Sequence, residues 1–314
     1  MNNSIKNPAD FITPLTINGL KGRVLRIPAQ KTSVQKNEIL FVYGHHASLE
    51  RVFGIVDSVT AHGNVTVPDL PGFGGMDSFY TIGQRPTLDN MADYLATFIK
   101  LNYKKQVVTL AGMSFGFLVI TRMLQKYPKL AKQTKLLVSI VGFSNFKDFK
   151  FKKKTWLTFK HGSRLFSSRL SSLFIEHIIL RGPVIRAAYA LVADKHAKMK
   201  DADSVERNRR IDFEIYLWQC NDIRTYMATT TIMMTLDLTK KRVDLPLVHI
   251  TIDADQYFDN ETVKINLNKI YKKVKIYKAK MPAHAPTIIS DAKTAYGFIP
   301  PAVRRLLSRA AKQT

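Results

Sequence analysis

Cysteine is almost absent from this chain of 314 residues, which contains only Cys220. No disulfide can form within the chain, and no metal site can be built from several thiolates. Long apolar runs are absent too. The longest candidate, residues 170–193, contains Glu176, Arg181 and Arg186, whereas a membrane-spanning helix needs about 20 apolar residues. The first residues hold no apolar core of a secretory signal peptide. We therefore expect a cytoplasmic protein.

Acidic residues are scarce, because 24 Asp and Glu stand against 48 Lys and Arg and give a formal net charge of +24. The excess lies mainly in residues 147–200, with 13 basic and 3 acidic residues, and in residues 264–314, with 12 and 1. A hydrophobic fraction of 46% excludes a disordered charged chain. The charge raises three alternatives: a nucleic-acid surface, an anionic membrane contact, or a solvated periphery.

Short apolar runs separated by turn residues indicate buried strands. When such strands alternate with helices, the pattern is typical of a parallel sheet covered by helices on both faces. The sequence predicts strands at 38–44, 64–68, 106–111, 136–141, 246–252 and 274–279, and helices at 87–101, 117–127 and 302–311.

The pattern changes after residue 145. Strand-like runs stop, and helical segments rich in Lys, Arg, Ser, Leu and Phe follow one another until about residue 235. The strand pattern then returns. We therefore predict one α/β core made of residues 1–145 and 236–314, with residues 146–235 inserted between two strands as a helical segment.

The sharpest local signal is Gly112-Met-Ser114-Phe-Gly116, which lies between a predicted strand and a predicted helix. A serine in a strand–turn–helix setting is typical of a nucleophile elbow. The turn is so tight that the residues two before and two after the serine must lack side chains. The alternative is an ordinary glycine-containing turn. Ser114 is the candidate nucleophile.

A serine nucleophile needs a base and a carboxylate that orients the base. His284 follows the predicted strand 274–279 and is the candidate base. Asp253, Asp255 and Asp259 follow the strand 246–252 at its carboxyl end, where open α/β sheets place their sites. One of these carboxylates is expected to orient the base, and the others are expected to cap a loop or helix.

The developing oxyanion needs backbone donors. We expect these to be the N–H groups of Phe115, directly after the nucleophile, and of His45, in the turn after the first core strand. The neighbouring pair His45-His46 could suggest a metal site. Adjacent residues rarely chelate one ion, however, and no partner set is evident, so we predict neither a metal nor a cofactor.

With these residues assembled, the chain resembles the α/β-hydrolase superfamily, in its cap-bearing branch of esterases and lipases. The resemblance runs from about Glu38 to His284. It rests on the turn at Gly44, the loop Asp69-x-Pro-Gly-x-Gly74, the elbow, the strand 246–252 with its following acid, and the pair His284-x-Pro286.

The resemblance implies a mostly parallel central sheet flanked by helices, with residues 146–235 as a cap over the site. Family spacing places the acid nine residues after the proline that opens its strand, which selects Asp255. Asp148, after the preceding strand, is the alternative. Relatives such as haloalkane dehalogenases and epoxide hydrolases need an aspartate at the elbow, and Ser114 argues against both.

The chain departs from the family pattern at Tyr43, where relatives commonly have His, and also at Met113, Phe117 and Ile252. None of these departures removes a catalytic atom, but they leave the subfamily and the substrate open.

The resemblance implies a serine hydrolase that cleaves a carboxylic ester with an apolar acyl chain through Ser114, His284, Asp255 and an acyl-enzyme. Alternatives are the same triad acting on an amide or a C–C bond, and a non-catalytic binding protein on the same fold. Met227, Met233 and Met234 have two interpretations. They could line a pocket for the acyl chain, or they could simply pack the cap onto the core.

We expect a small-molecule ester as the binding partner, no nucleic acid, and a monomer or homodimer. The run Lys150-Phe-Lys-Lys-Lys154, with Trp156 and Phe159 nearby, could lie against an anionic membrane. That contact would make the protein peripheral to the inner face of the membrane. A solvated basic surface is the alternative.

Overall fold

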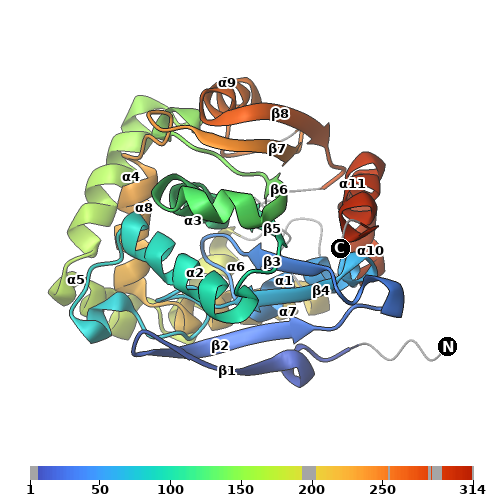
Figure 1. The fold of residues 1–314 in the computed structure, drawn as a ribbon. Coiled ribbons are helices and arrows are strands. Elements are labelled where there is room, and N and C mark those ends of the chain that lie inside the picture. The colour runs from blue at the N-terminus through green and yellow to red at the C-terminus, as the bar shows by residue number, and fades with distance from the viewer. Residues whose placement is uncertain (1–5, 193–202, 254, 282–283, 285–291, 313–314) are drawn as a thin grey trace.

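The computed structural model describes residues 6–192, 203–253, 255–281, 284 and 292–312. Its centre is an 8-stranded sheet in the order β1-β2-β4-β3-β5-β6-β7-β8 (Figure 1). All neighbouring pairs from β4 to β8 are parallel, whereas β1 pairs with β2, and β2 with β4, in antiparallel fashion. The strands are β1 (Ile12–Ile17), β2 (Leu20–Ile27), β3 (Glu38–Val42), β4 (Asn64–Pro68), β5 (Val108–Met113), β6 (Thr134–Ile140), β7 (Val243–Thr251) and β8 (Tyr271–Lys278).

The predicted strands correspond to β3 through β8, with shifted ends. The hairpin of β1 and β2 is an addition to them. Its strands carry exposed polar side chains among apolar ones, so they lack the continuous apolar run of a central strand. Asn18 and Gly19 at the turn have φ values of 53° and 81°. Such an Asn-Gly pair is the usual connection of a two-residue hairpin.

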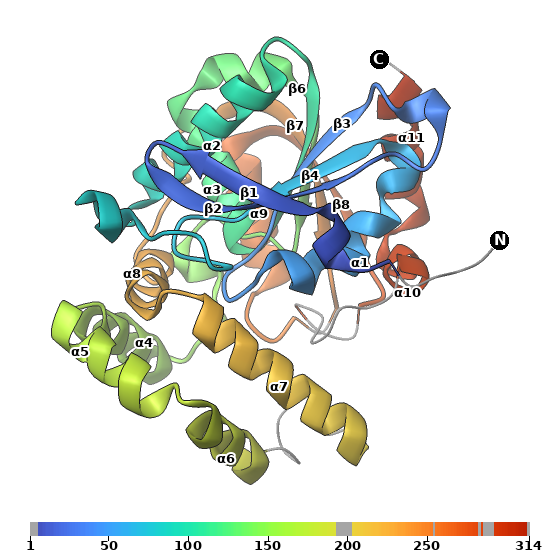
Figure 2. The same cartoon turned by 90° about the horizontal axis from the view of Figure 1, so that it is seen from below.

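Helices cover both faces of the sheet. Figure 2 shows α2 and α3 on one side and α1, α10 and α11 on the other. Helix α2 begins after its N-cap Thr87, whose side chain accepts a hydrogen bond from the N–H of Asn90. The core helices are α1 (Leu49–Ser58), α2 (Leu88–Tyr103), α3 (Phe115–Lys126), α9 (Asn260–Ile270), α10 (Ala292–Phe298) and α11 (Pro301–Lys312).

Short helical turns punctuate the connections. They are η1 (Pro8–Phe11), η2 (Thr32–Val34), η3 (Thr60–His62), η4 (Phe79–Ile82), η5 (Pro128–Gln133) and η6 (Phe146–Asp148).

Between β6 and β7, every element from residue 153 to residue 233 is helical in the part that the structure describes. Figure 2 shows these helices together on one side of the sheet-containing body. Among them α4 packs on α8, and α6 packs on α7. The inserted helices are α4 (Lys153–Phe166), α5 (Arg169–Phe174), the π-helical turn η7 (Ile175–Ile179), α6 (Gly182–Val192), α7 (Ser204–Cys220) and α8 (Ile223–Met233).

Hydrogen bonds join the inserted helices to the core at the loop 69–75, and one of them runs from the N–H of Asp222 to the carbonyl oxygen of Gly72 at 2.9 Å. The N–H of Gly74 donates to Oδ1 of Asn221 at 2.9 Å, and the N–H of Gly75 donates to the carbonyl oxygen of Cys220 at 2.6 Å. The junction between α7 and α8 is thereby held against the Asp-x-Pro-Gly-x-Gly loop.

The basic block at the C-terminal end has a structural explanation in β8, which forms an edge of the sheet. Lys272 and Lys278 are exposed and pair with Asp244 and Asp253. Lysines along an edge strand hinder pairing with a strand of another molecule. In the described part of the chain, no helix combines the length and apolar character needed to cross a bilayer.

Candidate functional site

Ser114 lies in the turn between β5 and α3, at the carboxyl end of a central strand. Its φ of 48° and ψ of −116° form a conformation that non-glycine residues adopt only when their surroundings impose it. A Cβ atom on Gly116 would lie 2.3 Å from the carbonyl oxygen of Tyr43, and one on Gly112 would lie 2.7 Å from Cα of Phe117. The two glycines therefore allow the turn to pack against β3 and α3.

Three of the predicted side chains meet at this turn. Nε2 of His284 lies 3.1 Å from Oγ of Ser114, and Nδ1 of His284 lies 2.8 Å from Oδ2 of Asp255. The three residues follow β5, β7 and β8, so the parallel strands bring their loops to one edge of the sheet. The rings of Tyr257 and Phe258 each have their centroid 5.2 Å from that of His284 and flank the imidazole.

Asp255 is buried, and each of its carboxylate oxygens has a partner. Oδ2 faces His284, while Oδ1 accepts hydrogen bonds from the N–H groups of Tyr257 at 2.8 Å and Phe258 at 3.1 Å. Burial alone would raise the pKa of this carboxyl. The hydrogen bond and charge of His284 and the two backbone donors outweigh burial and lower the pKa of Asp255 below its ordinary value. The carboxylate is therefore ionised at neutral pH and favours the His284 tautomer with a proton on Nδ1.

The other candidate acids have different partners. Asp253 forms a surface ion pair of 2.7 Å with Lys278, and Asp259 caps the N-terminus of α9. Asp148 is buried and accepts a hydrogen bond of 2.6 Å from the side chain of Asn266. Their contacts are those of surface and capping carboxylates.

The turn after β3 lies directly against Ser114. A Cβ atom on Gly44 would stand 3.2 Å from Cβ of Ser114, so the backbone of His45 flanks the same turn. The N–H of Phe115 opens helix α3, and the first N–H groups of a helix have no acceptor within it. The helix dipole also favours negative charge at this end. Both predicted oxyanion donors therefore belong to backbone that borders Ser114.

The rings of His45 and His46 have different partners. Nε2 of His45 lies 2.9 Å from Oγ1 of Thr229, and Nε2 of His46 lies 3.1 Å from Oε2 of the buried Glu214. Burial is the main cause that lowers the pKa of His45 to about 3, so this ring is neutral. Within the ranges that the structure describes, no group of three or more His, Cys, Asp and Glu side chains could hold a metal ion.

A cavity of about 330 Å³ opens at Ser114 and His284, and we refer to it as the Ser114 cavity. Its walls are mainly aromatic and sulfur-containing side chains. Met233 and Met234 are among them, whereas Met227 is not. The apolar and aromatic lining comprises Phe149, Phe151, Phe159, Tyr226, Met233, Met234, Tyr257 and Phe258.

Arg51 also lines the Ser114 cavity, and the sequence analysis did not single it out. Its side chain is buried, and Nη1 donates a hydrogen bond of 2.6 Å to the carbonyl oxygen of His46. Arg51 lies on α1, which was not among the predicted helices. A signal was present, because the N-cap Ser48 is followed at helical spacing by Leu49, Val52, Phe53 and Val56.

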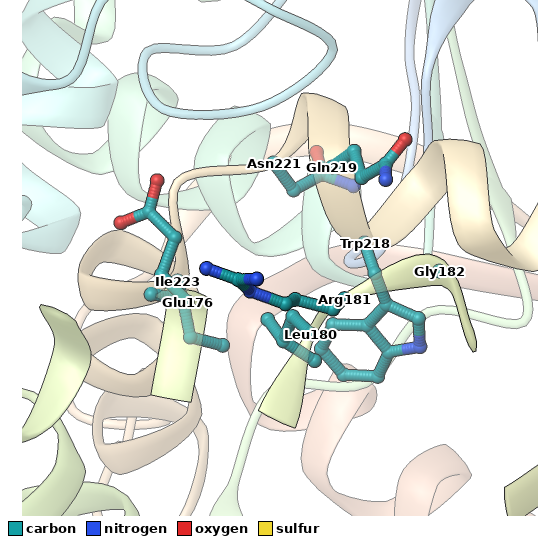
Figure 3. A pocket seen from close by; sticks show the side chains of 8 residues that line it. All are labelled: Glu176, Leu180, Arg181, Gly182, Trp218, Gln219, Asn221 and Ile223. Atoms are coloured by element: carbon teal, nitrogen blue, oxygen red, sulfur yellow. The ribbon is translucent and has the colours of Figure 1, made fainter. Parts of the chain in front are cut away.

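A second pocket of about 280 Å³ lies within the inserted helices, where Trp218 contributes to its wall (Figure 3). The Trp218 ring also packs against His46, with centroids 4.3 Å apart. Trp218 thus contacts both His46, which lines the Ser114 cavity, and this second pocket. The pocket is lined by Glu176, Leu180, Arg181, Gly182, Trp218, Gln219, Asn221 and Ile223.

Comparison with known proteins gives a limited match in sequence. A family model described as bacterial virulence protein (VirJ) matches residues 69–173, which include β5, Ser114 and α3. No curated protein matches the chain.

Solved structures match over nearly the whole chain. A thermophilic esterase from Thermogutta terrifontis has a TM-score of 0.60 and 15% identity, covering 96% of this chain and 98% of that one. A putative lipase from Acinetobacter baumannii AYE has a TM-score of 0.63 and 15% identity, covering 96% and 92%. A membrane phospholipase A, described as a bacterial virulence factor, has a TM-score of 0.62 and 12% identity, covering 96% and 86%.

These neighbours are α/β-hydrolases, and they share the mostly parallel sheet flanked by helices over almost all of the chain. At such low identity the similarity establishes the fold and nothing finer. The chain described here has the α/β-hydrolase fold.

Proposed function

We propose that the protein is a serine hydrolase in which Ser114, His284 and Asp255 form the catalytic triad. The observation that carries the proposal is the pair of hydrogen bonds at His284, 3.1 Å to Ser114 and 2.8 Å to Asp255. A nucleophile, a base and an orienting carboxylate in this geometry are the recurring arrangement of serine-based acyl transfer. The hydrolases among the structural neighbours support the same class of reaction.

In the proposed mechanism, Oγ of Ser114 attacks the substrate carbonyl and Nε2 of His284 takes the hydroxyl proton. Asp255 holds the imidazole in place and stabilises the imidazolium. The N–H groups of His45 and Phe115 hold the oxyanion of the tetrahedral intermediate. His284 then gives its proton to the leaving alcohol, and an acyl-enzyme remains. Water, deprotonated by His284, releases the acid and restores Ser114.

The proposed substrate is a carboxylic ester with an apolar acyl chain. The Ser114 cavity has a volume of about 330 Å³ and is lined largely by aromatic rings and by Met233 and Met234. Apolar walls favour hydrocarbon, and methionine adapts to chains of different shape. The low pKa of His45 keeps that ring uncharged beside the site, which also suits a neutral ester.

We further propose that residues 146–235 act as a cap over a core formed by 1–145 and 236–314. Phe159, Tyr226 and Met233 come from inserted helices and line the Ser114 cavity. The same helices are joined to the loop 69–75 through Gly74 and Asn221. Removal of the inserted helices would therefore take away one wall of the cavity.

A fluorophosphonate probe tests the nucleophile. We expect the wild-type protein and Ser139→Ala to be labelled and Ser114→Ala to be unlabelled. Ser139 is a matched control, because it is buried and its Oγ lies 3.0 Å from Nδ1 of His249 without a place in the proposed triad. Labelling that persists in Ser114→Ala, or an unlabelled wild-type protein, would overturn the proposal.

A panel of nitrophenyl esters of increasing chain length, assayed beside an aminoacyl amide, tests the bond and the acyl preference. We expect ester turnover that improves from acetyl to medium-length chains and is absent in Ser114→Ala. Preferential cleavage of the amide would support the alternative amidase. Binding of esters without turnover would support a non-catalytic protein on this fold.

A further inference from the structure

The outer layer of the inserted helices exposes an unusual amount of apolar surface. Figure 2 shows α4, α5 and α6 beyond α7 and α8, on the side away from the sheet. Of the 15 large apolar side chains that are exposed among the described residues, 10 lie in this layer. They are Phe159, Leu165, Phe166, Leu170, Leu173, Phe174, Ile178, Ile179, Val184 and Leu191.

These side chains lie at least partly in solvent, outside the buried interior of the insertion. The inward positions of the same segment are occupied by other residues, such as Ile175 and Ile185, which are buried. Leu170 and Leu191, by contrast, are 82% and 87% exposed. Exposed apolar side chains that gather in one layer of a soluble protein commonly mark an interaction site. We therefore expect the outer layer to bind an apolar surface that is not part of this chain.

The same layer is strongly basic. Residues 153–192, from which this layer is built, contain 7 Lys and Arg and a single acidic residue, Glu176. Lys154, Arg164 and Arg169 are exposed alongside the apolar side chains. Some of the basic-aromatic run near residue 150 faces inward instead, because the Trp156 ring donates a hydrogen bond of 3.0 Å to the carbonyl oxygen of Met234. The surface that remains available is centred on residues 159–191.

We propose that this outer face of α4, α5, η7 and α6 docks onto an anionic lipid surface. Exposed leucine, isoleucine and phenylalanine side chains enter the boundary between headgroups and acyl chains, and lysine and arginine pair with anionic headgroups. A membrane provides an apolar interior for the exposed hydrophobic side chains and negative charge for the basic ones.

Other occupants fit the surface less well. A second copy of the chain would bring two faces of the same positive sign together, which like-charge repulsion opposes. Nucleic acid would pair with the basic side chains but would leave the aliphatic ones in water, because bases stack on aromatic rings rather than on leucine or isoleucine.

The docked face reaches the Ser114 cavity at Phe159. This ring lines the cavity, stacks on Phe151 with centroids 5.2 Å apart, and is 45% exposed. An apolar molecule leaving the lipid surface would therefore meet aromatic side chains between the membrane and Ser114. The docking itself does not depend on the proposed hydrolysis.

Vesicle co-sedimentation tests the proposal. We expect the full chain to pellet with phosphatidylcholine–phosphatidylglycerol vesicles and to remain in the supernatant with phosphatidylcholine alone. Leu170→Ser combined with Leu191→Ser should weaken binding at least tenfold. The matched control combines Leu101→Ser on α2 with Ile265→Ser on α9, two side chains that are exposed outside the face. The control should bind as the wild type does.

A second pair of variants tests the charge. Lys154→Glu with Arg169→Glu should weaken binding to the anionic vesicles roughly tenfold or more, because two side chains that attract anionic headgroups become side chains that repel them. Lys273→Glu with Lys275→Glu, on the edge strand β8, makes the same change of charge elsewhere and should have little effect.

Three results would overturn the proposal. They are equal binding to neutral and anionic vesicles, equal weakening by the face and control variants, and a dimer in sedimentation velocity that Leu170→Ser with Leu191→Ser dissociates. Ser114→Ala should bind vesicles as the wild type does, and the face variants should still hydrolyse a soluble short-chain ester. A failure of docking is thus distinguishable from a failure of the proposed chemistry.

Discussion

The phenol of Tyr43 donates a hydrogen bond of 2.9 Å to Oδ1 of Asp69, and both side chains are fully buried. The same phenol oxygen accepts a hydrogen bond of 2.9 Å from the N–H of Leu70. Tyr43 precedes the turn that carries His45, and Asp69 opens the loop 69–75. The side chain of Tyr43 therefore links the loop after β3 to the loop after β4.

Tyr43→Phe should lower the free energy of unfolding by about 2 kcal/mol, because it leaves buried groups of Asp69 and Leu70 without a partner. Tyr271→Phe is the control. It removes one hydrogen bond of 2.7 Å to the hydroxyl of Thr121, between two neutral groups, and should cost about 1 kcal/mol. Urea unfolding measures both values. An equal or smaller loss in Tyr43→Phe would contradict the linking role.

Gly116→Ala should destabilise the fold by more than about 3 kcal/mol or prevent its formation, because the new Cβ would overlap backbone carbonyl oxygens that cannot move aside. Those oxygens belong to Val42 and Tyr43, each 2.3 Å away. Gly162→Ala on α4 is the opposite case, since a Cβ there meets no atom within 4 Å. It should stabilise the helix by up to about 1 kcal/mol. Denaturation midpoints of the two variants should move in opposite directions.

Asp255→Asn should lower kcat for a nitrophenyl ester by about a thousandfold or more, because the amide can no longer hold a charged imidazolium or fix its tautomer. Asp253→Asn changes the same chemical group two residues earlier, in an exposed ion pair with Lys278. This control should keep nearly full activity. Comparable losses in both variants would argue against a specific role for Asp255.

Stability should depend on pH through His249. Burial lowers the pKa of this ring to about 4 in the folded protein, whereas the unfolded chain binds the proton at about pH 6.5. The unfolded state therefore gains protons first as the pH falls, and stability is lost between these two values. The contribution of His249 to that loss is at most about 3 kcal/mol.

The test compares unfolding free energies of the wild type and His249→Gln at neutral pH and near pH 4. The variant should lose less stability on acidification than the wild type. His161→Gln, at an exposed position on α4, should behave as the wild type does. An unchanged pH dependence in His249→Gln would show that this ring does not carry the effect.

Local sequence patterns were sufficient for the central strands and for the position of Ser114. Mainly apolar runs predict β3 to β7, because strands covered on both faces must be apolar, whereas the edge strand β8 carries exposed lysines among its apolar residues. The glycines around Ser114 predict the tight turn. The choice of Asp255 came instead from the spacing within the resemblance. Local sequence could not separate it from Asp253 and Asp259, because all three occupy the same loop.

The rest of the site depends on contacts between distant parts of the chain. His46 and Glu214 are separated by 168 positions, and the sequence contains no local signal that pairs them. Arg51 was missed for a different reason, since Gly54 interrupts an otherwise helical apolar pattern in α1. The first hairpin has no continuous apolar runs, but the pair Asn18-Gly19 at its turn could have predicted it from the sequence.

The chain has one thiol, and its position makes it a built-in reporter. Cys220 lies where α7 meets the loop 69–75, and its carbonyl oxygen accepts the hydrogen bond from Gly75. Burial is the main cause that raises the pKa of this thiol to about 12, so alkylating reagents should react slowly with it. Any movement that separates the inserted helices from the loop would hydrate the sulfur. The rate at which Cys220 is alkylated in the protein therefore reports how often the inserted helices separate from the loop 69–75, and no engineered label is needed.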